Sequence, residues 1–301
     1  MPDGSGRLRG RVCVVTGATS GIGLATAAAL ARLGARVIGI GRDAGRAETA
    51  LRRIEAAAAG SGAPPPAFDL ADLSSMAETR DLAARLGAIP EGIDVLVSCA
   101  GVFTNRRTLS SEGLETQFAV NHLAPFLLTT ALLPRLSAVP DGRIVVVSSA
   151  SHRFGRIRWV DPSRSLGYSG LGAYGQSKLA NVLFVRELAR RLGAGSTVTV
   201  FAADPGLVNT DMGLKHGRSL TGLGWRLRRL AGTSPEVPAE GIACLASSPE
   251  LRRRTGLYWK DCRELAPSTR ALDPEAARRL WDLSEGILRE ALGRGGPAGN
   301  S

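Results

Sequence analysis

A glycine-rich turn near the N-terminus restricts the fold of this 301-residue sequence more than any other feature. A short β-branched run at residues 12–15 breaks into the sequence TGATSGIG at residues 16–23, and an Ala/Leu-rich stretch follows to Leu33. This order predicts a strand, a tight turn and a helix. Glycines let a ligand approach the backbone, and a helix N-terminus offers free N–H groups to phosphate. The turn is therefore typical of a dinucleotide site, although a plain strand-to-helix connection can look similar.

Strand and helix patterns alternate along the rest of the chain. Apolar runs that predict strands lie at residues 36–40, 67–68, 95–98, 144–147, 197–202 and near 257–260. Stretches of helical composition lie at residues 44–59, 74–86, 114–136, 173–192, 235–247 and 274–292. A run as apolar as 144–147 needs cover on both faces, as in a parallel sheet. The sequence therefore predicts an α/β fold: a Rossmann-type, doubly wound parallel sheet of about seven strands with helices on both faces.

Length and composition favour one domain spanning residues 1–301. With 44% hydrophobic residues, a chain of this length can bury one substantial core, and no linker or internal repeat interrupts it. The Gly-rich ends, residues 1–8 and 293–301, are expected to be flexible. Residues 209–234 mix glycine, arginine and apolar residues and form a candidate substrate lid.

Charge bears on the choice of partners. The formal net charge of +11 could signal nucleic acid or a membrane surface. However, the arginines are spread along the expected helices, and no basic segment with interleaved aromatic residues is present. We therefore expect no nucleic-acid partner. The opposite hypothesis, a basic nucleic-acid-binding protein, predicts salt-dependent retention on DNA.

Cysteine usage and hydropathy bear on the compartment. The four cysteines, Cys13, Cys99, Cys244 and Cys262, form neither a CxxC pair nor a metal-binding spacing. They are expected to be small core residues, and no metal is expected. The N-terminus is polar, and no stretch reaches ~18 uninterrupted apolar residues. We expect a cytoplasmic protein without an integral membrane span.

A second motif, Tyr174-Gly175-Gln176-Ser177-Lys178, carries acid/base chemistry. Residues four apart on a helix share one face, so Tyr174 and Lys178 are expected to be neighbours. A phenol with a pKa of ~10 is a poor base at neutral pH, but a nearby ammonium and an oxidised nicotinamide favour the phenolate. Taken alone, the spacing also fits ordinary helix content.

In combination, these motifs resemble the short-chain dehydrogenase/reductase family. TGxxxGxG at 16–23, Asn121, Ser148-Ser149, YxxxK at 174–178 and Pro205-Gly206 occur in the family's order, and the resemblance covers residues 7–292. It implies that Tyr174 is the general acid/base, that Lys178 binds the nicotinamide ribose and lowers the pKa of Tyr174, and that Ser149 hydrogen-bonds the substrate oxygen. Ser149 is chosen over Ser148 because the family's serine is the later of such a pair. Asn121 would hold a water that links Lys178 to solvent.

The resemblance also implies which residues bind the cofactor. These are Gly17, Thr19, Ser20, Gly21, Ile22, Gly23, Arg42, Asp69, Leu70, Ala100, Gly101, Tyr174, Lys178, Pro205, Gly206, Val208 and Thr210. NAD-preferring relatives place an acidic residue at the end of the second strand, where this chain has Gly41 and Arg42. A guanidinium can bind a 2′-phosphate, so NADP is expected; the alternative is that Arg42 is one more surface arginine.

Two positions depart from the family pattern. Ser98-Cys99-Ala100-Gly101 stands where Asn-Asn-Ala-Gly is common, and Asp204-Pro205-Gly206 stands where close relatives often have His-Pro-Gly. Neither change removes a catalytic group. The usual asparagine contacts that brace the sheet must be absent or replaced.

Within the family the chain is similar to the retinol dehydrogenase and WW-domain-oxidoreductase-like branch. The residues that carry this likeness are 121–123, 148–152, 176–184 and 256–262. The likeness implies a lipophilic carbonyl or alcohol substrate and allows a homodimer or homotetramer. A pocket is expected from residues 150–172 and 209–234, lined by Phe154, Trp159, Leu166, Leu214, Leu223 and Trp225. The segment 220–230 equally fits an amphipathic helix on a membrane or partner, or a core-facing helix.

Two functions from different classes follow. The first is an NADP-dependent oxidoreductase that interconverts a carbonyl and an alcohol. The second is an NADP-sensing binding protein that keeps the fold and regulates a partner. A pure sensor has no need of Asn121, Ser149, Tyr174 and Lys178 together, which favours the enzyme.

Overall fold

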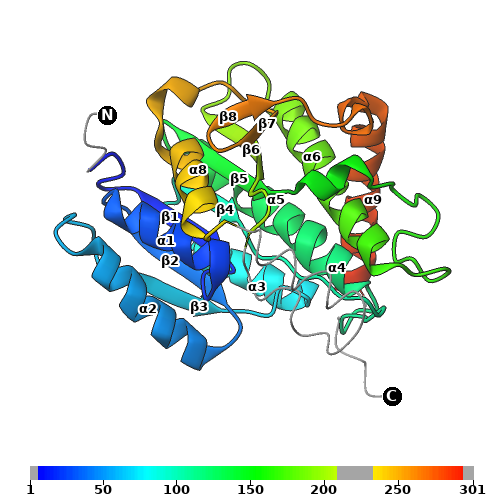
Figure 1. Ribbon diagram of the computed structural model, residues 1–301, viewed down its shortest axis with the longest axis horizontal. Helices are drawn as coiled ribbons and strands as arrows, with labels where there is room; N and C mark the ends of the chain where they lie inside the picture. Colours follow the sequence, from blue (N-terminus) through cyan, green and yellow to red (C-terminus); the bar gives the residue numbers. More distant parts are fainter. Residues whose placement is uncertain (1–5, 209–232, 294–301) are drawn as a thin grey trace.

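One eight-stranded sheet forms the centre of the computed structural model, which describes residues 6–208 and 233–293 (Figure 1). The spatial order is β3-β2-β1-β4-β5-β6-β7-β8. All neighbours are parallel except β7 and β8, which are antiparallel. The strands are β1 Val12–Thr16, β2 Arg36–Gly41, β3 Ala67–Leu70, β4 Val95–Ser98, β5 Gly142–Val147, β6 Val198–Asp204, β7 Leu257–Lys260 and β8 Arg263–Leu265. The predicted doubly wound parallel sheet is confirmed, with β8 as one strand more than expected.

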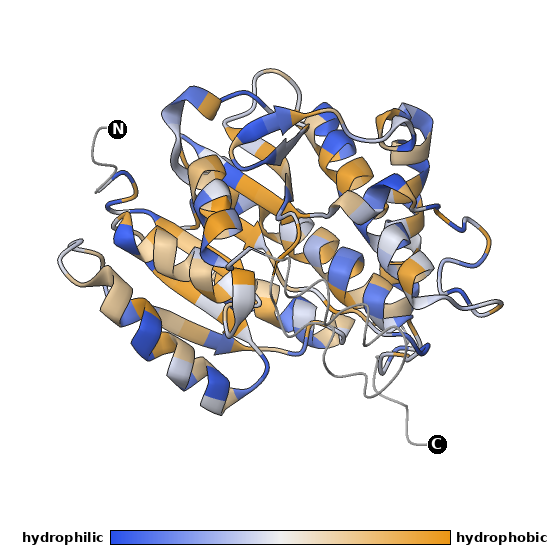
Figure 2. Ribbon diagram, in the orientation of Figure 1, coloured by the Kyte–Doolittle hydropathy of each residue, from blue (hydrophilic) through white to orange (hydrophobic). Residues whose placement is uncertain are grey.

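Helices cover both faces of this sheet. They are α1 Gly21–Arg32, α2 Ala44–Ala58, α3 Met76–Gly87, α4 Thr116–Phe118, α5 Ala124–Ser137, α6 Gly170–Leu192, α8 Glu236–Ser247 and α9 Pro274–Gly293. Side chains of α3, α5, α6 and α9 share one hydrophobic core, and side chains of α1, α2 and α8 share the other. Successive strand residues alternate between the two cores, as Val14 and Val15 do. Figure 2 accordingly shows the central strands as mostly apolar and the outer face of α2 as polar.

The long helix expected at 114–136 is interrupted. α4 is followed by a π-helical turn, Ala119–Leu123, in which the N–H of Ala124 donates to the carbonyl of Ala119. Pro125 has no N–H to give to the carbonyl of Asn121, and the side-chain amide of Asn181 on α6 donates to that oxygen instead at 2.9 Å. Such single π turns are frequent at functional sites. The proline thus explains why the helix is irregular beside Asn121.

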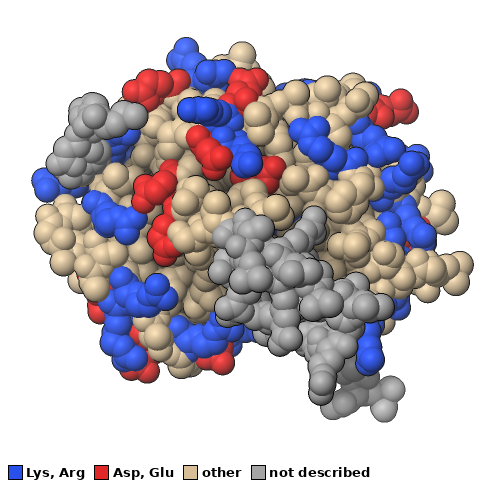
Figure 3. Space-filling model, viewed as in Figure 1, with Lys and Arg blue, Asp and Glu red and all other residues tan. Residues whose placement is uncertain are grey.

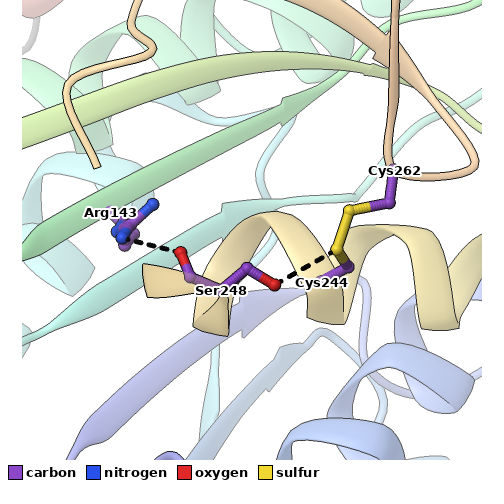
Figure 4. Close-up of a disulfide and its surroundings, with 4 residues drawn as sticks. All are labelled: Arg143, Cys244, Ser248 and Cys262. Carbon is purple, nitrogen blue, oxygen red and sulfur yellow. Dashed lines mark hydrogen bonds between the residues drawn. A yellow bond between two sulfur atoms is a disulfide. The ribbon is translucent and has the colours of Figure 1, made fainter. Parts of the chain in front are cut away.

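The expectation that all four cysteines are core residues was wrong for two of them. Cys13 is buried in β1 and Cys99 follows β4 as a second free thiol. Cys244 on α8 and Cys262 in the turn between β7 and β8 form a disulfide with a Cα–Cα distance of 6.0 Å (Figure 4). Ser248 lies one helical turn from Cys244, and its carbonyl accepts a 3.1 Å hydrogen bond from Arg143. The two cysteines meet because α8 packs against that turn.

Parts of the expected flexible ends and of the candidate lid, residues 1–5, 209–232 and 294–301, lie outside the described residues. Leu8, within the N-terminal segment, is buried and its N–H donates to the carbonyl of Leu33. None of the helices formed by residues 6–208 and 233–293 has the length and apolar character needed to span a bilayer.

Candidate active site

Carboxyl ends of the parallel strands meet along one edge of the sheet. The chain leaves β1 for β2 on one side, whereas β4 lies on the other side of β1. A crevice at such a switch point is where doubly wound folds bind their ligands. The glycine turn after β1, Ala100 and Gly101 after β4, and Ser149 after β5 all lie at this edge.

The glycine turn has the geometry that a phosphate site requires. Gly17 has φ +71°, and a β-carbon there would lie 2.9 Å from the Cα of Ala100, so only glycine fits. Ser20 is the N-cap of α1, but its side chain does not bond the helix, and no acidic residue lies in the first turn. The first N–H groups of α1 therefore have no side-chain cap and can bind an anion. The described residues fit the pyrophosphate of a dinucleotide.

Thr16 braces the turn to the neighbouring strand. Its hydroxyl oxygen accepts hydrogen bonds from the N–H groups of Cys99 and Ala100, both at 3.0 Å. The missing asparagines at positions 98 and 99 are thus replaced by a contact from β1. Thr16 is not among the predicted site residues, although it is the first residue of the turn motif.

Tyr174 and Lys178 share one face of α6, as predicted. The ammonium nitrogen of Lys178 lies 5.5 Å from the centre of the Tyr174 ring and donates to the carbonyl of Val147 at 3.0 Å. Phe103 packs edge-on against Tyr174 with ring centres 5.7 Å apart. Lys178 is buried, whereas Tyr174 is partly exposed. The helix therefore places a partly exposed tyrosine beside a buried cation.

Burial dominates the electrostatics of this pair. It raises the pKa of Tyr174 to about 12, although a hydrogen bond with Ser149 acts to lower that pKa, while the charge of Asp204 raises it. Burial also lowers the pKa of Lys178 to about 8, and the nearby Cys99 and Asp204 act to raise it. In the protein alone the phenol is therefore the acid form at neutral pH. Lys178 was expected to lower the pKa of Tyr174, but in the protein alone that pKa is raised. Lowering it would need a further positive charge near the phenol.

The two serines after β5 differ in their contacts. The hydroxyl of Ser148 donates to the carbonyl of Lys178 at 2.8 Å, which ties the end of β5 to α6. Ser149 is partly exposed, and its Oγ accepts from the N–H of Ser151 at 3.2 Å, so its proton remains available for donation. This agrees with the choice of Ser149 as the substrate-facing serine, and its catalytic role stays a prediction.

Asn121 is a bracing residue in this structure. Its Oδ1 accepts from the N–H of Val102 at 2.7 Å, and its Nδ2 donates to the carbonyl of Val102 at 3.0 Å and to Ser177 Oγ at 3.1 Å. The side chain therefore joins the segment after β4 to α6. Its expected contact with a water is not tested by these bonds.

Other predicted cofactor residues are spread along the same edge. Arg42 follows β2 and lies 3.5 Å from Asp72, and its side chain is 60% exposed. The carboxylate of Asp69 is held by Arg85 at 2.9 Å, and Leu70 is exposed. Pro205, Gly206 and Val208 follow β6, and Val208 pairs with Thr233. Thr210 lies outside the described residues.

Two buried glutamines hold the candidate substrate loop and were missed in the sequence. The amide of Gln176 donates to the carbonyl of Pro162 at 2.7 Å and accepts from the N–H of Arg158 at 3.1 Å. The amide of Gln117 donates to the hydroxyl of Tyr168 at 2.7 Å. The position of Gln176 inside the Tyr174–Lys178 motif was the available signal.

The expected pocket lining is only partly assembled by the described residues. Phe154 is 55% exposed and its ring lies against Gly175, next to Tyr174. Trp159 instead packs under the guanidinium of Arg279, 4.5 Å from the ring centre, and Leu166 is 77% exposed. Leu214, Leu223 and Trp225 lie outside the described residues.

Comparison with known proteins agrees with this geometry. The family model described as "short chain dehydrogenase" matches residues 11–219. Retinol dehydrogenase 14 of Mus musculus is 41% identical over 301 aligned residues, which cover 94% of this chain and 88% of the relative. Polyprenol dehydrogenase of Mus musculus is 39% identical over 298 residues, with 95% and 85% covered.

Solved structures with a similar fold also include short-chain dehydrogenases. An uncharacterised protein of Mycobacterium paratuberculosis has a TM-score of 0.70 and 34% identity, with 93% of this chain and 94% of that chain covered. A short chain dehydrogenase of Shigella flexneri, solved with NADP, has a TM-score of 0.67, with 86% and 100% covered; at 23% identity it shows the shared fold. This chain therefore belongs to the short-chain dehydrogenase/reductase family, in its retinol dehydrogenase-like branch.

Proposed function

We propose that this chain is an NADP-dependent oxidoreductase that interconverts a carbonyl and an alcohol on a lipophilic small molecule. The observation that carries the proposal is Tyr174, which is hydrogen-bonded to Ser149 and has the buried Lys178 ammonium 5.5 Å from its ring centre. Relatives named for retinol and polyprenol support a lipophilic substrate. The exposed Phe154 ring beside Gly175 offers an apolar contact near the phenol.

The reaction needs proton movement at one oxygen. When bound, the nicotinamide supplies or accepts the hydride. Tyr174, with a pKa raised to about 12 by burial, donates its phenolic proton to the carbonyl oxygen in reduction and takes it back from the alcohol in oxidation. The Ser149 hydroxyl, which hydrogen-bonds Tyr174 in the protein alone, donates its proton to the same oxygen. The Lys178 ammonium, 5.5 Å from the ring, stabilises the phenolate that forms.

NADP preference is supported by the end of β2. A β-carbon at Gly41 would lie 2.4 Å from the methyl carbon of Thr19, so the acidic residue of NAD-preferring relatives has no room here. Arg42 next to it is exposed, and its guanidinium lies 3.5 Å from the carboxylate of Asp72. Its guanidinium is available for a 2′-phosphate.

Turnover of lipophilic aldehydes and ketones, followed at the nicotinamide absorbance with NADPH and NADH, tests the proposal. Tyr174→Phe is the control, because it keeps the ring and removes the proton. We expect NADPH-dependent turnover that the variant loses while it still binds NADPH. If the wild type binds NADPH but no substrate in a broad panel is converted, and Tyr174→Phe leaves a partner response intact, the sensor function replaces the enzyme.

A further inference from the structure

His152 lies in a chain of buried contacts that begins at Ser149. It belongs to the 3₁₀ turn Ala150–Arg153 that follows the serine, and it is fully buried. Its Nδ1 is 2.8 Å from the carbonyl of Ser149, and its Nε2 is 3.0 Å from the N–H of Ser268. A carbonyl can only accept and a backbone N–H can only donate. His152 must therefore be neutral, with its proton on Nδ1.

The ring of His152 packs on Tyr258 of β7, with ring centres 4.7 Å apart. Tyr258 is buried, and its hydroxyl donates to Oδ2 of Asp204 at 2.6 Å. Oδ1 of the same carboxylate accepts from the N–H of Gly206 at 2.9 Å. Contacts thus run without a gap from the backbone of Ser149 to the turn that follows β6.

We propose that His152, Tyr258 and Asp204 are positioning residues that hold the Ser149 segment and the Pro205-Gly206 turn in one fixed arrangement. The inference rests on the proposed function, in which Ser149 would contact the substrate oxygen and the Pro205-Gly206 turn would hold the cofactor. Tyr258, which comes from the neighbouring strand, touches both His152 and Asp204.

Alternative roles of these groups can be separated by their contacts. A proton relay would need His152 to exchange protons, but both of its nitrogens face backbone groups that cannot. The charged or titratable groups near Asp204 are Tyr258 and Lys260 on β7, Tyr174 and Lys178 on α6, and His152. Among the described residues, no cation is in hydrogen-bond contact with Asp204, and its two oxygens accept from Tyr258 and Gly206. Its geometry is that of a clamp between two donors.

Two substitutions at position 152 test its two hydrogen bonds separately. Asparagine places an amide N–H near the position of Nδ1, so His152→Asn keeps the donor to Ser149. Glutamine places an oxygen near the position of Nε2, so His152→Gln keeps the acceptor for Ser268. One hydrogen bond corresponds to about a tenfold change in rate. We expect His152→Gln to lower kcat about tenfold more than His152→Asn, with KM for NADPH unchanged in both.

Position 204 gives the matching test on the cofactor side. Asp204→Asn can accept from Gly206 with its oxygen and donate to the Tyr258 hydroxyl with its nitrogen, whereas Asp204→Leu can do neither. We expect Asp204→Leu to raise the KM for NADPH about tenfold and Asp204→Asn to restore it. Equal effects of the two, or equal effects of Gln and Asn at 152, would overturn the positioning roles.

A measurement independent of turnover keeps the inference separate from the proposed function. The chain has three histidines, so ¹⁵N spectra of histidine-labelled protein are simple, and His152→Gln assigns the signal. We expect the Nδ1–H tautomer at pH 7, unchanged in Tyr168→Phe, which removes a phenol bonded to a different buried carboxylate, Glu115. An Nε2–H tautomer refutes the inference even if the enzyme is active. The Nδ1–H tautomer in a protein without turnover refutes only the proposed function.

Discussion

The ammonium nitrogen of Lys178 donates to the carbonyl of Val147 at 3.0 Å and has no carboxylate partner among the described residues. A buried cation held by a single neutral oxygen destabilises the fold. Its pKa is lowered from 10.5 to about 8 by this burial. The residue most needed for phenolate chemistry is therefore one that costs the protein stability.

Lys178→Met should raise stability at pH 7 while abolishing turnover. The shift in the Lys178 pKa corresponds to a penalty of about 3 kcal/mol, from which about 1 kcal/mol is subtracted for the lost hydrogen bond. Between pH 8 and 10 the unfolded chain holds more protons than the folded wild type, so the unfolding free energy of the wild type should rise with pH. Denaturant melts at pH 7 and pH 10 check both effects. A variant less stable than wild type at pH 7 contradicts the prediction.

His122 should make the protein sensitive to acid. It is buried between Asn181 and Ser284, and burial lowers its pKa from 6.5 to about 4. As pH falls from 6.5 to 4, the unfolded chain binds a proton that the folded chain does not, so stability decreases, by about 3 kcal/mol across the window. His122→Gln should flatten this part of the curve of unfolding free energy against pH. The same slope in both proteins argues against His122 as the cause.

A gain of NADH activity should need substitutions at two positions together. Gly41→Asp alone brings a β-carbon within 2.4 Å of the Thr19 methyl, so we expect loss of stability without gain of NADH activity. Thr19→Ser removes that methyl, and the double variant should favour NADH. Arg42→Ala should lower kcat/KM for NADPH at least tenfold and leave NADH unaffected. Steady-state rates with both cofactors decide, and an unchanged NADPH rate in Arg42→Ala would exclude a phosphate contact there.

The disulfide should contribute measurably to stability. It closes a loop with a sequence separation of 18, for which chain entropy predicts about 3 kcal/mol. Cys244→Ser and a reducing agent added to wild type should lower the melting temperature equally. Cys99→Ser is the matched control, since Cys99 is not paired and, like Cys244, is only partly buried.

Thiol titration of the unfolded, non-reduced protein checks the pairing directly. The paired state gives two reactive thiols, from Cys13 and Cys99, and the reduced state gives four. The expected cytoplasmic location remains a prediction, and disulfides are rare in that reducing compartment. Four thiols in protein isolated from cells would mean that the bond is open there.

The sheet could be predicted because its strands are apolar on both faces and its first turn is glycine-rich. β8 could not, since Arg263–Leu265 is short, exposed and without an apolar pattern. Tyr174 and Lys178 could be paired because helical geometry fixes residues four apart. The contacts of Tyr258 with His152 and Asp204, and of Cys244 with Cys262, join segments whose proximity depends on how β7 and α8 pack.

The distribution of charged residues over the surface also could not be predicted from the sequence. On the face shown in Figure 3, lysines and arginines lie among acidic and uncharged residues and form no continuous basic stripe in the part of the surface that is described. Several arginines, such as Arg85 and Arg191, are paired with carboxylates. The absence of a nucleic-acid partner stays a prediction, for which salt-dependent DNA retention is the measurement.

Pro125 affects how the residues before the π turn are rotated relative to α5. A residue with an N–H at this position could complete an ordinary helical bond to Asn121 and compete with the amide of Asn181 for that oxygen. If the π turn became regular α-helix, the residues before it would rotate by about 100° relative to α5. This angle corresponds to one residue of an α-helix. The Asn121 side chain would then point away from Val102. The orientation of the Asn121 side chain thus depends on Pro125, four residues later, because proline has no backbone N–H.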